Sequence, residues 1–130
     1  MKIEKPITEN QKQLANKIYK YLYHEHRFVT KEEICIMLGW EYTSSNDRKI
    51  RDTINVIKKR KPIVATPDRK GYFAATNKSD LEEVIHQWKY IDSIIEDLEE
   101  TKKPLIEFYE KFGNSVDSVF GSYKENKNEL

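Results

Sequence analysis

Residues 58–76 have the sequence KKRKPIVATPDRKGYFAAT, in which a basic run precedes a short apolar segment, a turn with two more cations and a second apolar segment. Residues 63–66 and 72–75 have the apolar composition typical of short strands. The sequence PDRKG between them contains the Pro, Asp and Gly that favour a tight turn. We therefore expect a small β-hairpin with basic clusters before its first strand and at its tip.

Two helices are expected upstream of this hairpin. Thr8 and Gln11 have the spacing of a capping box that begins the first helix. Apolar residues then recur at helical spacing, at Leu14, Ile18, Tyr21 and Leu22. After a brief β-type stretch at residues 27–29, Thr30 and Glu33 repeat the capping pattern, and Gly39 is placed to end a short second helix.

A third helix is expected at residues 46–60, with Ser44 or Ser45 as its cap and Pro62 as its stop. Its buried stripe consists of Ile50, Ile54 and Ile57. At about 100° per residue, the opposite face carries Arg48, Asp52, Asn55 and Lys59, with Lys49, Arg51 and Lys58 on the flanks. The helix is therefore expected to be buried by its isoleucines and basic on its outer face.

The order helix, strand, helix, turn, helix, strand, loop, strand resembles the winged helix-turn-helix family, of the type at the front of biotin repressors and in small phage and prophage proteins. The resemblance is carried by TKEEICIMLGW (residues 30–40), SSNDRKIRDTINVIKKR (44–60) and KPIVATPDRKGYFAAT (61–76), and covers about residues 8–76. The segment between the second and third helices is longer and more polar than in the shortest members. The resemblance implies a mainly α (α+β) fold with a two-stranded β wing.

In that family the third helix enters the major groove of double-stranded DNA and the wing touches the backbone or the neighbouring minor groove. Arg can bond guanine, and Asn adenine, through paired hydrogen bonds. The candidates for base contact are Ser45, Asn46, Arg48 and Asn55. The candidates for phosphate contact are Lys49, Arg51, Lys58, Lys59, Lys61, Arg69 and Lys70. The alternative is a solvated helix face on which Arg48 and Asp52 form an ion pair.

The charge distribution agrees with a nucleic-acid partner. Residues 1–76 contain 16 Lys and Arg against 9 Asp and Glu, a net charge of +7, and hold all five arginines. Residues 77–130 contain 7 against 13, a net charge of −6. A basic half with clustered arginine is the electrostatic footprint of a nucleic-acid binder, whereas an acidic half is suited to protein or solvent.

Several other classes of protein are disfavoured. The single cysteine, Cys35, excludes an internal disulfide and any cysteine cluster for zinc, and we expect it in the core. His24 and His26 diverge on a helix, so we expect a solvent-facing helix end and no metal. No glycine-rich phosphate loop or nucleophile elbow is present. No segment approaches the roughly 18 apolar residues of a membrane span. We expect a cytoplasmic protein that is not an enzyme and needs no cofactor.

The acidic half begins with a capping-box pattern at Ser79 and Glu82, which predicts a long helix. Its apolar residues alternate at spacings of three and four, as in a coiled-coil seam. The seam consists of Leu81, Val84, Trp88, Ile91, Ile95 and Leu98. Pro104 is expected to end or kink this helix, and a shorter aromatic helix follows, in which Leu105 and Phe108 add to a dimer core. The alternative is a fourth helix that packs its stripe on the domain.

The expected organisation is a winged helix-turn-helix domain at residues 1–76, a helical dimerisation or interaction region at 77–112 and a flexible tail at 113–130. The function that follows is double-stranded DNA binding by a homodimer, as a phage or prophage transcriptional regulator or a replication accessory protein. The alternative is a protein-protein interaction module in which the winged fold is a scaffold and the acidic helix binds a partner.

Overall fold

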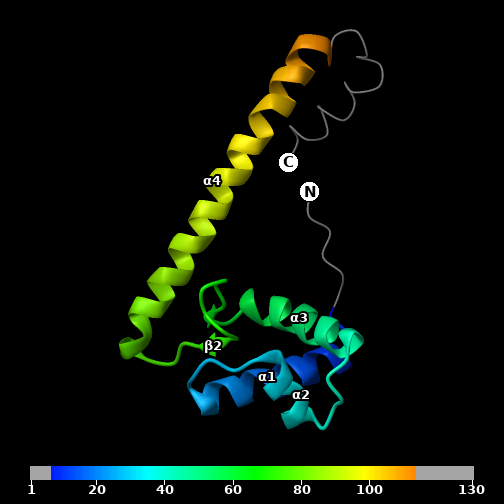
Figure 1. Cartoon of the computed structure of the whole chain (residues 1–130), viewed down its shortest axis with the longest axis vertical. Helices are drawn as coiled ribbons and strands as arrows, with labels where there is room; N and C mark the ends of the chain where they lie inside the picture. Colours follow the sequence, from blue (N-terminus) through cyan, green and yellow to red (C-terminus); the bar gives the residue numbers. More distant parts are fainter. Residues whose placement is uncertain (1–6, 114–130) are drawn as a thin grey trace. The chain divides into compact units, whose positions relative to one another are not determined.

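The computed structural model describes residues 7–113 and is mainly helical, with a small antiparallel sheet (Figure 1). Its elements are α1 (Glu9–Glu25), α2 (Lys31–Leu38), α3 (Ser44–Lys58), β1 (Ile63–Val64), β2 (Phe73–Ala74), the 3₁₀ turn η1 (Lys78–Asp80) and α4 (Leu81–Phe112). The chain forms two units, residues 6–90 and a second that begins at Ile91, with the boundary inside α4. Except for Gly113, the tail expected at 113–130 lies outside the described residues.

The caps expected for the first two helices are confirmed. Thr8 begins α1, where its backbone N–H donates to Gln11 Oε1 (3.0 Å) and the Gln11 N–H donates to Thr8 Oγ1 (3.2 Å). Thr30 and Glu33 form the same reciprocal pair at the start of α2. Gly39 ends α2 at φ 72°, a left-handed conformation that glycine adopts without a Cβ penalty.

The expected cap of α3 is wrong by one residue. Thr43, in an extended conformation, accepts a hydrogen bond from the Asn46 N–H (3.1 Å), so the helix begins at Ser44 and includes Ser45. The threonine hydroxyl reaches the third residue of the helix, as an N-cap does. At the other end α3 finishes at Lys58, before Pro62 can act as a stop.

The hairpin forms, with shorter strands than expected. Ile63 pairs with Ala74 and Val64 with Phe73 in antiparallel register. After β1, the Ala65 N–H donates to Gln87 Oε1 on α4 (2.6 Å). The β-type stretch before α2 is confirmed as an isolated bridge between Val29 and Tyr72, with reciprocal N–H···O distances of 2.8 Å.

The core of the first unit lies among α1, α2, α3 and the hairpin (Figure 1). The isoleucines of α3 are buried as expected, with exposed fractions of 0 to 4%. The other buried members are Ile18, Leu22, Val29, Ile34, Cys35, Ile63 and Ala74. Cys35 is therefore a core residue, and burial raises the pKa of its thiol.

The expected start of α4 is wrong, because Asn77 and Asp80, not Ser79 and Glu82, form the capping box. Asn77 Oδ1 accepts from the Ser79 N–H (2.9 Å), and Asp80 Oδ2 accepts from the Asn77 N–H (3.3 Å). This pair caps η1, which leads directly into α4 at Leu81. An Asx side chain competes well with serine for backbone donors, which explains the preference.

Asp80 also links the C-terminal end of α1 to the segment that precedes α4. Its buried carboxylate accepts from the Thr76 N–H (2.8 Å) and pairs with His26 Nε2 (2.9 Å). His26 caps α1 at a left-handed φ of 47°, and its ring contacts the Phe73 ring at a centroid distance of 5.3 Å. His26 is exposed at the end of α1, as expected, and its pairing with Asp80 is an additional role that the sequence did not predict. The hydrogen bond from Thr76, together with His26, lowers the pKa of the Asp80 carboxyl.

Pro104 neither ends nor interrupts α4, and the separate shorter helix expected at 105–112 does not form. Residues 81–112 make one helix with Pro104 inside it. A proline removes one backbone hydrogen bond, and good helix formers such as Glu100, Lys103 and Leu105 surround this position. Within residues 7–113 no helix combines the length and apolar character needed to cross a membrane.

A substitution at Gly71 tests how closely the hairpin packs against Val29. It has a φ of +100°, and a Cβ there would collide with the Val29 carbonyl oxygen. Gly39 is also left-handed but has open space around it. We expect Gly71→Ala to lower the free energy of unfolding by about 3 kcal/mol or more, and Gly39→Ala by only about 1 kcal/mol. Urea denaturation of both variants checks this, and equal losses would contradict the placement of Gly71 against Val29.

Asp80 predicts a pH-dependent contribution to stability. Because its folded-state pKa lies below the unfolded value of about 4, its contribution is present at neutral pH and is lost as the pH falls through the folded-state pKa. Asp80→Asn should therefore lower the free energy of unfolding at pH 7, and the deficit should shrink as the pH falls below about 4. Asp52→Asn, at an exposed position of α3, is the control. If the loss in free energy of unfolding caused by Asp80→Asn did not depend on pH, the lowered pKa of the Asp80 carboxyl would be refuted.

Candidate nucleic-acid interface

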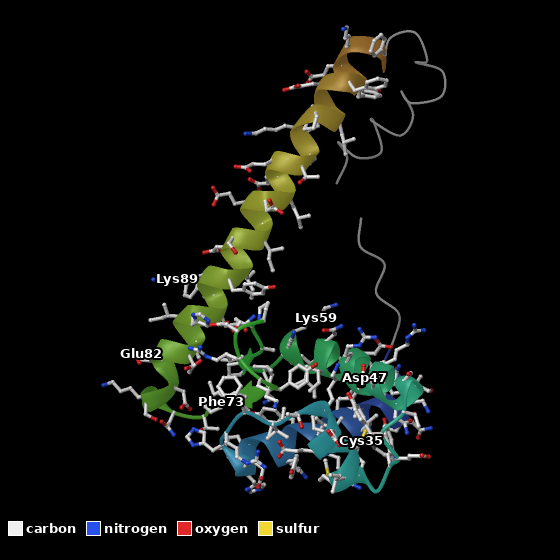
Figure 2. All side chains as sticks on the ribbon, in the orientation of Figure 1. Cys35, Asp47, Lys59, Phe73, Glu82 and Lys89 are labelled. Atoms are coloured by element: carbon white, nitrogen blue, oxygen red, sulfur yellow. The ribbon has the colours of Figure 1, made fainter. Side chains whose placement is uncertain are left out.

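The outer face of α3 carries most of the predicted contact residues. Burial of Ile50, Thr53, Ile54 and Ile57 turns the opposite side of the helix outward. Figure 2 shows Asp47 and Lys59 at the two ends of α3. Seven of the predicted residues are exposed on this helix or, for the last of them, at its C-cap: Ser45, Arg48, Lys49, Arg51, Asn55, Lys58 and Lys59. The structure thus brings them together on one element, as expected.

Asn46 differs from its neighbours because it is half-buried and already hydrogen-bonded. Its Nδ2 donates to the Glu41 carbonyl oxygen (2.7 Å). This bond holds the turn before α3 against the first turn of the helix. Asn46 therefore has a structural role. To make the predicted contact with adenine, its side chain would have to give up the hydrogen bond to Glu41.

The first turn of α3 is organised by Asp47. Its carboxylate lies 2.8 Å from Lys31 Nζ, accepts from the Tyr42 hydroxyl (2.9 Å) and lies 3.5 Å from Arg51 Nε. Lys31, followed by Tyr42, lowers the pKa of the Asp47 carboxyl. Arg51 is thus partly neutralised by Asp47. The Arg48–Asp52 pair expected on a solvated face is not among the ion pairs of the described residues.

Two further cations lie over aromatic rings. Lys49 Nζ is 5.9 Å from the centroid of the Trp40 ring, and Lys61 Nζ is 5.2 Å from that of Tyr19. Cation–π contact orients an ammonium group without cancelling its charge. At the end of α3, desolvation lowers the pKa of the Lys58 ammonium. Lys49 and Lys61 are therefore positioned by ring contacts, and all three lysines keep donors available for an anionic partner.

The hairpin tip is attached to α4 by polar contacts. Arg69 Nε and Nη2 donate to the two carboxylate oxygens of Glu83 at 3.0 and 3.2 Å, and Arg69 Nη1 lies 3.1 Å from Asp68. His86 Nε2 lies 3.0 Å from Asp68, and the Thr66 hydroxyl and His86 lower the pKa of the Asp68 carboxyl to about 2. Arg69 is therefore paired within the chain, and Lys70 remains the cation of the tip that has no ion-pair partner within residues 7–113.

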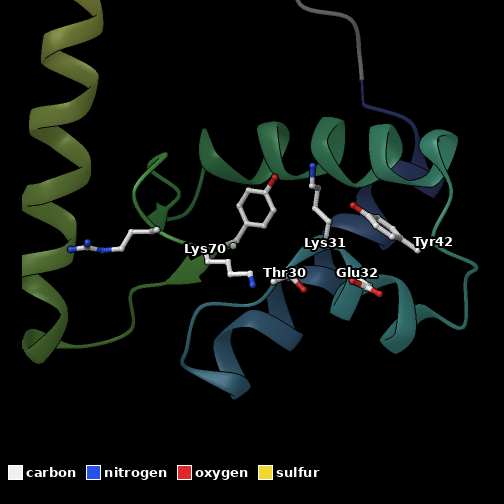
Figure 3. Close-up of a pocket in the computed structure, with 8 residues that line it drawn as sticks. Thr30, Lys31, Glu32, Tyr42 and Lys70 are labelled. Carbon is white, nitrogen blue, oxygen red and sulfur yellow. The ribbon is translucent and has the colours of Figure 1, made fainter.

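A groove of about 390 Å³ connects the hairpin tip with the start of α2 (Figure 3). Figure 3 shows Lys31 extending toward α3 and Tyr42 beside it, with Lys70 near Thr30. A second groove of about 460 Å³ lies beside Arg48 and Arg51 and shares Tyr42 with the first. The two grooves lead from the first turn of α3 to the hairpin tip past Tyr42.

The contacts separate the predicted cations into two groups. Arg51 and Arg69 are paired with carboxylates. The others have no ion-pair partner within residues 7–113: Arg48, Lys49, Lys58, Lys59, Lys61 and Lys70. Sequence reasoning missed Lys31 and Tyr42, which join the site only through Asp47. A spacing pattern does not reveal them, because Lys31 belongs to a different helix. Among the described residues no group of three or more His, Cys, Asp or Glu side chains is arranged to hold a metal ion.

Comparison with known proteins adds no assignment: the chain matches no family model, no curated protein and no solved structure. The interface must therefore be interpreted from its own residues.

Proposed function

We propose that this chain binds double-stranded DNA as a winged helix-turn-helix protein, with α3 in the major groove and the β1–β2 hairpin on the backbone. The observation that carries the proposal is the set of cations on the outer face of α3 and at the hairpin tip, Arg48, Lys59 and Lys70 among them, that have no ion-pair partner within residues 7–113. Phosphate oxygens are the partners that best satisfy exposed cations in such an arrangement.

The order of elements supports the same proposal. α2 and α3 are joined by residues 39–43, and α3 is followed by an antiparallel hairpin. Val29 before α2 pairs with Tyr72 in that hairpin. This is the order of helices, short strand and wing that the family resemblance implies. An exposed helix beside a hairpin fits the dimensions of a major groove and the adjoining backbone.

The residues divide into roles by chemistry. Arg48 and Asn55 lie on the outermost part of α3 and are suited to base edges, with Ser45 at the beginning of the helix. Lys49, Lys58, Lys59, Lys61 and Lys70 are suited to phosphates. Asp52 stands between them without an ion-pair partner among the described residues, and it can accept from cytosine N4. A transcriptional regulator and a replication accessory protein would both use this surface.

The second candidate is a protein-protein interaction module. It is favoured by the exposure of α4, because none of the residues of this helix is buried. Its exposed apolar side chains include Trp88 (65% exposed) and Leu98 (61% exposed). In that case α3 would be a solvated face and DNA binding would be absent. The salt dependence of DNA binding separates the two candidates.

The first test measures binding of a random-sequence duplex by fluorescence anisotropy across a salt series. If about five phosphates are neutralised, the logarithm of affinity should fall against the logarithm of salt with a slope of roughly −4 to −5. Replacing Arg48, Lys59 and Lys70 together by Ala should reduce the steepness by about 2, because Lys59 and Lys70 are the phosphate contacts among them and each lost phosphate contact removes about 0.9.

The control replaces Lys12, Lys17 and Lys20, three exposed lysines of α1, by Ala. It changes the net charge equally and should leave the slope nearly unchanged. Equal effects of the two triple variants would show attraction by overall charge without a defined surface. Absence of binding by the unmodified chain at low salt would remove the DNA-binding proposal and favour the interaction module.

Glu83 provides a second test, because it holds Arg69. Glu83→Gln should release the guanidinium to phosphate, raise the affinity for duplex DNA and steepen the salt slope by about 1. Glu82→Gln removes the same charge from the neighbouring position, which is exposed and forms no ion pair with the hairpin within residues 7–113. If the two variants gained the same affinity for duplex DNA, the release of Arg69 from Glu83 would not be the cause of the gain.

A further inference from the structure

We propose that α4 pairs with α4 of a second copy of this chain in antiparallel orientation, with the helix midpoint at the centre of the interface. This inference concerns a different surface from the DNA interface and does not depend on it. Self-association is measured without DNA, so either proposal can fail while the other stands.

The surface is an apolar stripe along α4. Leu81, Trp88, Ile91, Ile95, Leu98 and Leu105 are each between 46% and 68% exposed. Val84 lies in the same stripe and is half-buried. Glu83, His86 and Gln87, which contact the hairpin, lie about 100° or more around the helix from Leu81 and Trp88. Attachment to the first unit therefore leaves the stripe uncovered at this end.

The stripe has the spacing and extent of a coiled-coil seam. With Leu81 at position a, the a and d positions run through Val84, Trp88, Ile91, Ile95 and Leu98 to Lys102 and Leu105. The 32-residue helix is roughly 48 Å long. If each apolar seam residue buries on the order of 100 Å², two copies together bury roughly 1,400 Å², which is enough for a stable interface.

Lys102 is the first argument for antiparallel orientation. It occupies an a position, and in a parallel pair in register its ammonium group would face the same group of the partner. In an antiparallel pair an a residue faces a d residue, so the register that overlaps the whole of α4 sets Lys102 opposite the partner's Ile91. The like-charge contact in the seam is then avoided.

Ile85 and Ile106 are the second argument. Both lie at e positions beside the seam and are 46% and 42% exposed. In a parallel pair e positions face g positions, which would set Ile85 opposite Asp80 and Ile106 opposite Thr101. In the antiparallel register e positions face each other, so Ile85 of one copy covers Ile106 of the other at both ends. This self-complementarity favours a second copy over an unrelated helix as the occupant.

The charges of α4 predict how salt acts on the pair. Residues 92–100 carry five carboxylates and no Lys or Arg. In an antiparallel pair these segments of the two copies lie beside each other and repel. Screening of that repulsion should strengthen self-association between about 50 and 500 mM salt. This is opposite to the dependence expected for DNA binding, so the two activities are distinguishable in one series.

The orientation is tested by disulfide cross-linking of Trp88→Cys and Leu105→Cys variants, alone and mixed. Cys35 is buried and does not compete. In the proposed register residue 88 faces residue 105, while the two copies of residue 88 are about 25 Å apart. We expect a cross-linked dimer in the mixture and little from either variant alone. Sedimentation equilibrium of the unmodified chain gives an independent measure of association.

Three outcomes would overturn the proposal. Efficient cross-linking of Trp88→Cys with itself would show a parallel pair. A dimer of the unmodified chain with no cross-link in the mixture would show a different register or interface. A monomer at about 100 μM and high salt would show that a second copy does not occupy the stripe, whatever the DNA experiments find.

Discussion

Burial of the α3 isoleucines is the constraint on which the rest of the first unit depends. Ile50, Ile54 and Ile57 are nearly inaccessible, and burying each side chain contributes about 2 kcal/mol. Because a helix has one orientation about its axis once this stripe is buried, the same contacts decide which side chains point outward. The basic face of α3 is thus a consequence of core packing. The hairpin, joined to α2 through Val29 and Tyr72, places Lys70 at the other side of the groove.

Carboxylates of the chain determine which cations remain available. Asp47 holds Lys31 and approaches Arg51, and Glu83 holds Arg69 through two hydrogen bonds. These pairs position α2 and the hairpin relative to α3 and to the first turns of α4. A count of basic residues overestimates such a surface, because a paired guanidinium must exchange one anion for another and gains little from the exchange.

The sequence predicted elements whose signals are local. Thr8, Thr30 and Gly39 act where their spacing placed them, and the isoleucine stripe identified the buried face of α3. The predictions that were wrong or missing concern two situations. In one, several neighbouring residues can cap the same helix; in the other, a side chain contacts a residue that is distant in the chain. The sequence does not distinguish Thr43 from the two serines that follow it, or Asn77 from Ser79, because several residues in each place can cap a helix. The partners of Asp80 and Arg69 lie 54 and 14 residues away, beyond any periodic pattern.

The proposed pairing of α4 changes what a DNA-binding dimer could do. Each copy's first unit is continuous with the N-terminal end of its α4, so an antiparallel pair separates the two attachment points by nearly the full length of the helix, roughly 45 Å. Recognition helices that read adjacent half-sites are one helical turn apart, about 34 to 36 Å. The antiparallel arrangement therefore sets the attachment points farther apart than the one-turn spacing of adjacent half-sites. Rising salt would strengthen the pairing of α4 and weaken the binding of α3 to DNA. Such a dimer would therefore be most stable at the high salt concentrations at which it binds DNA most weakly.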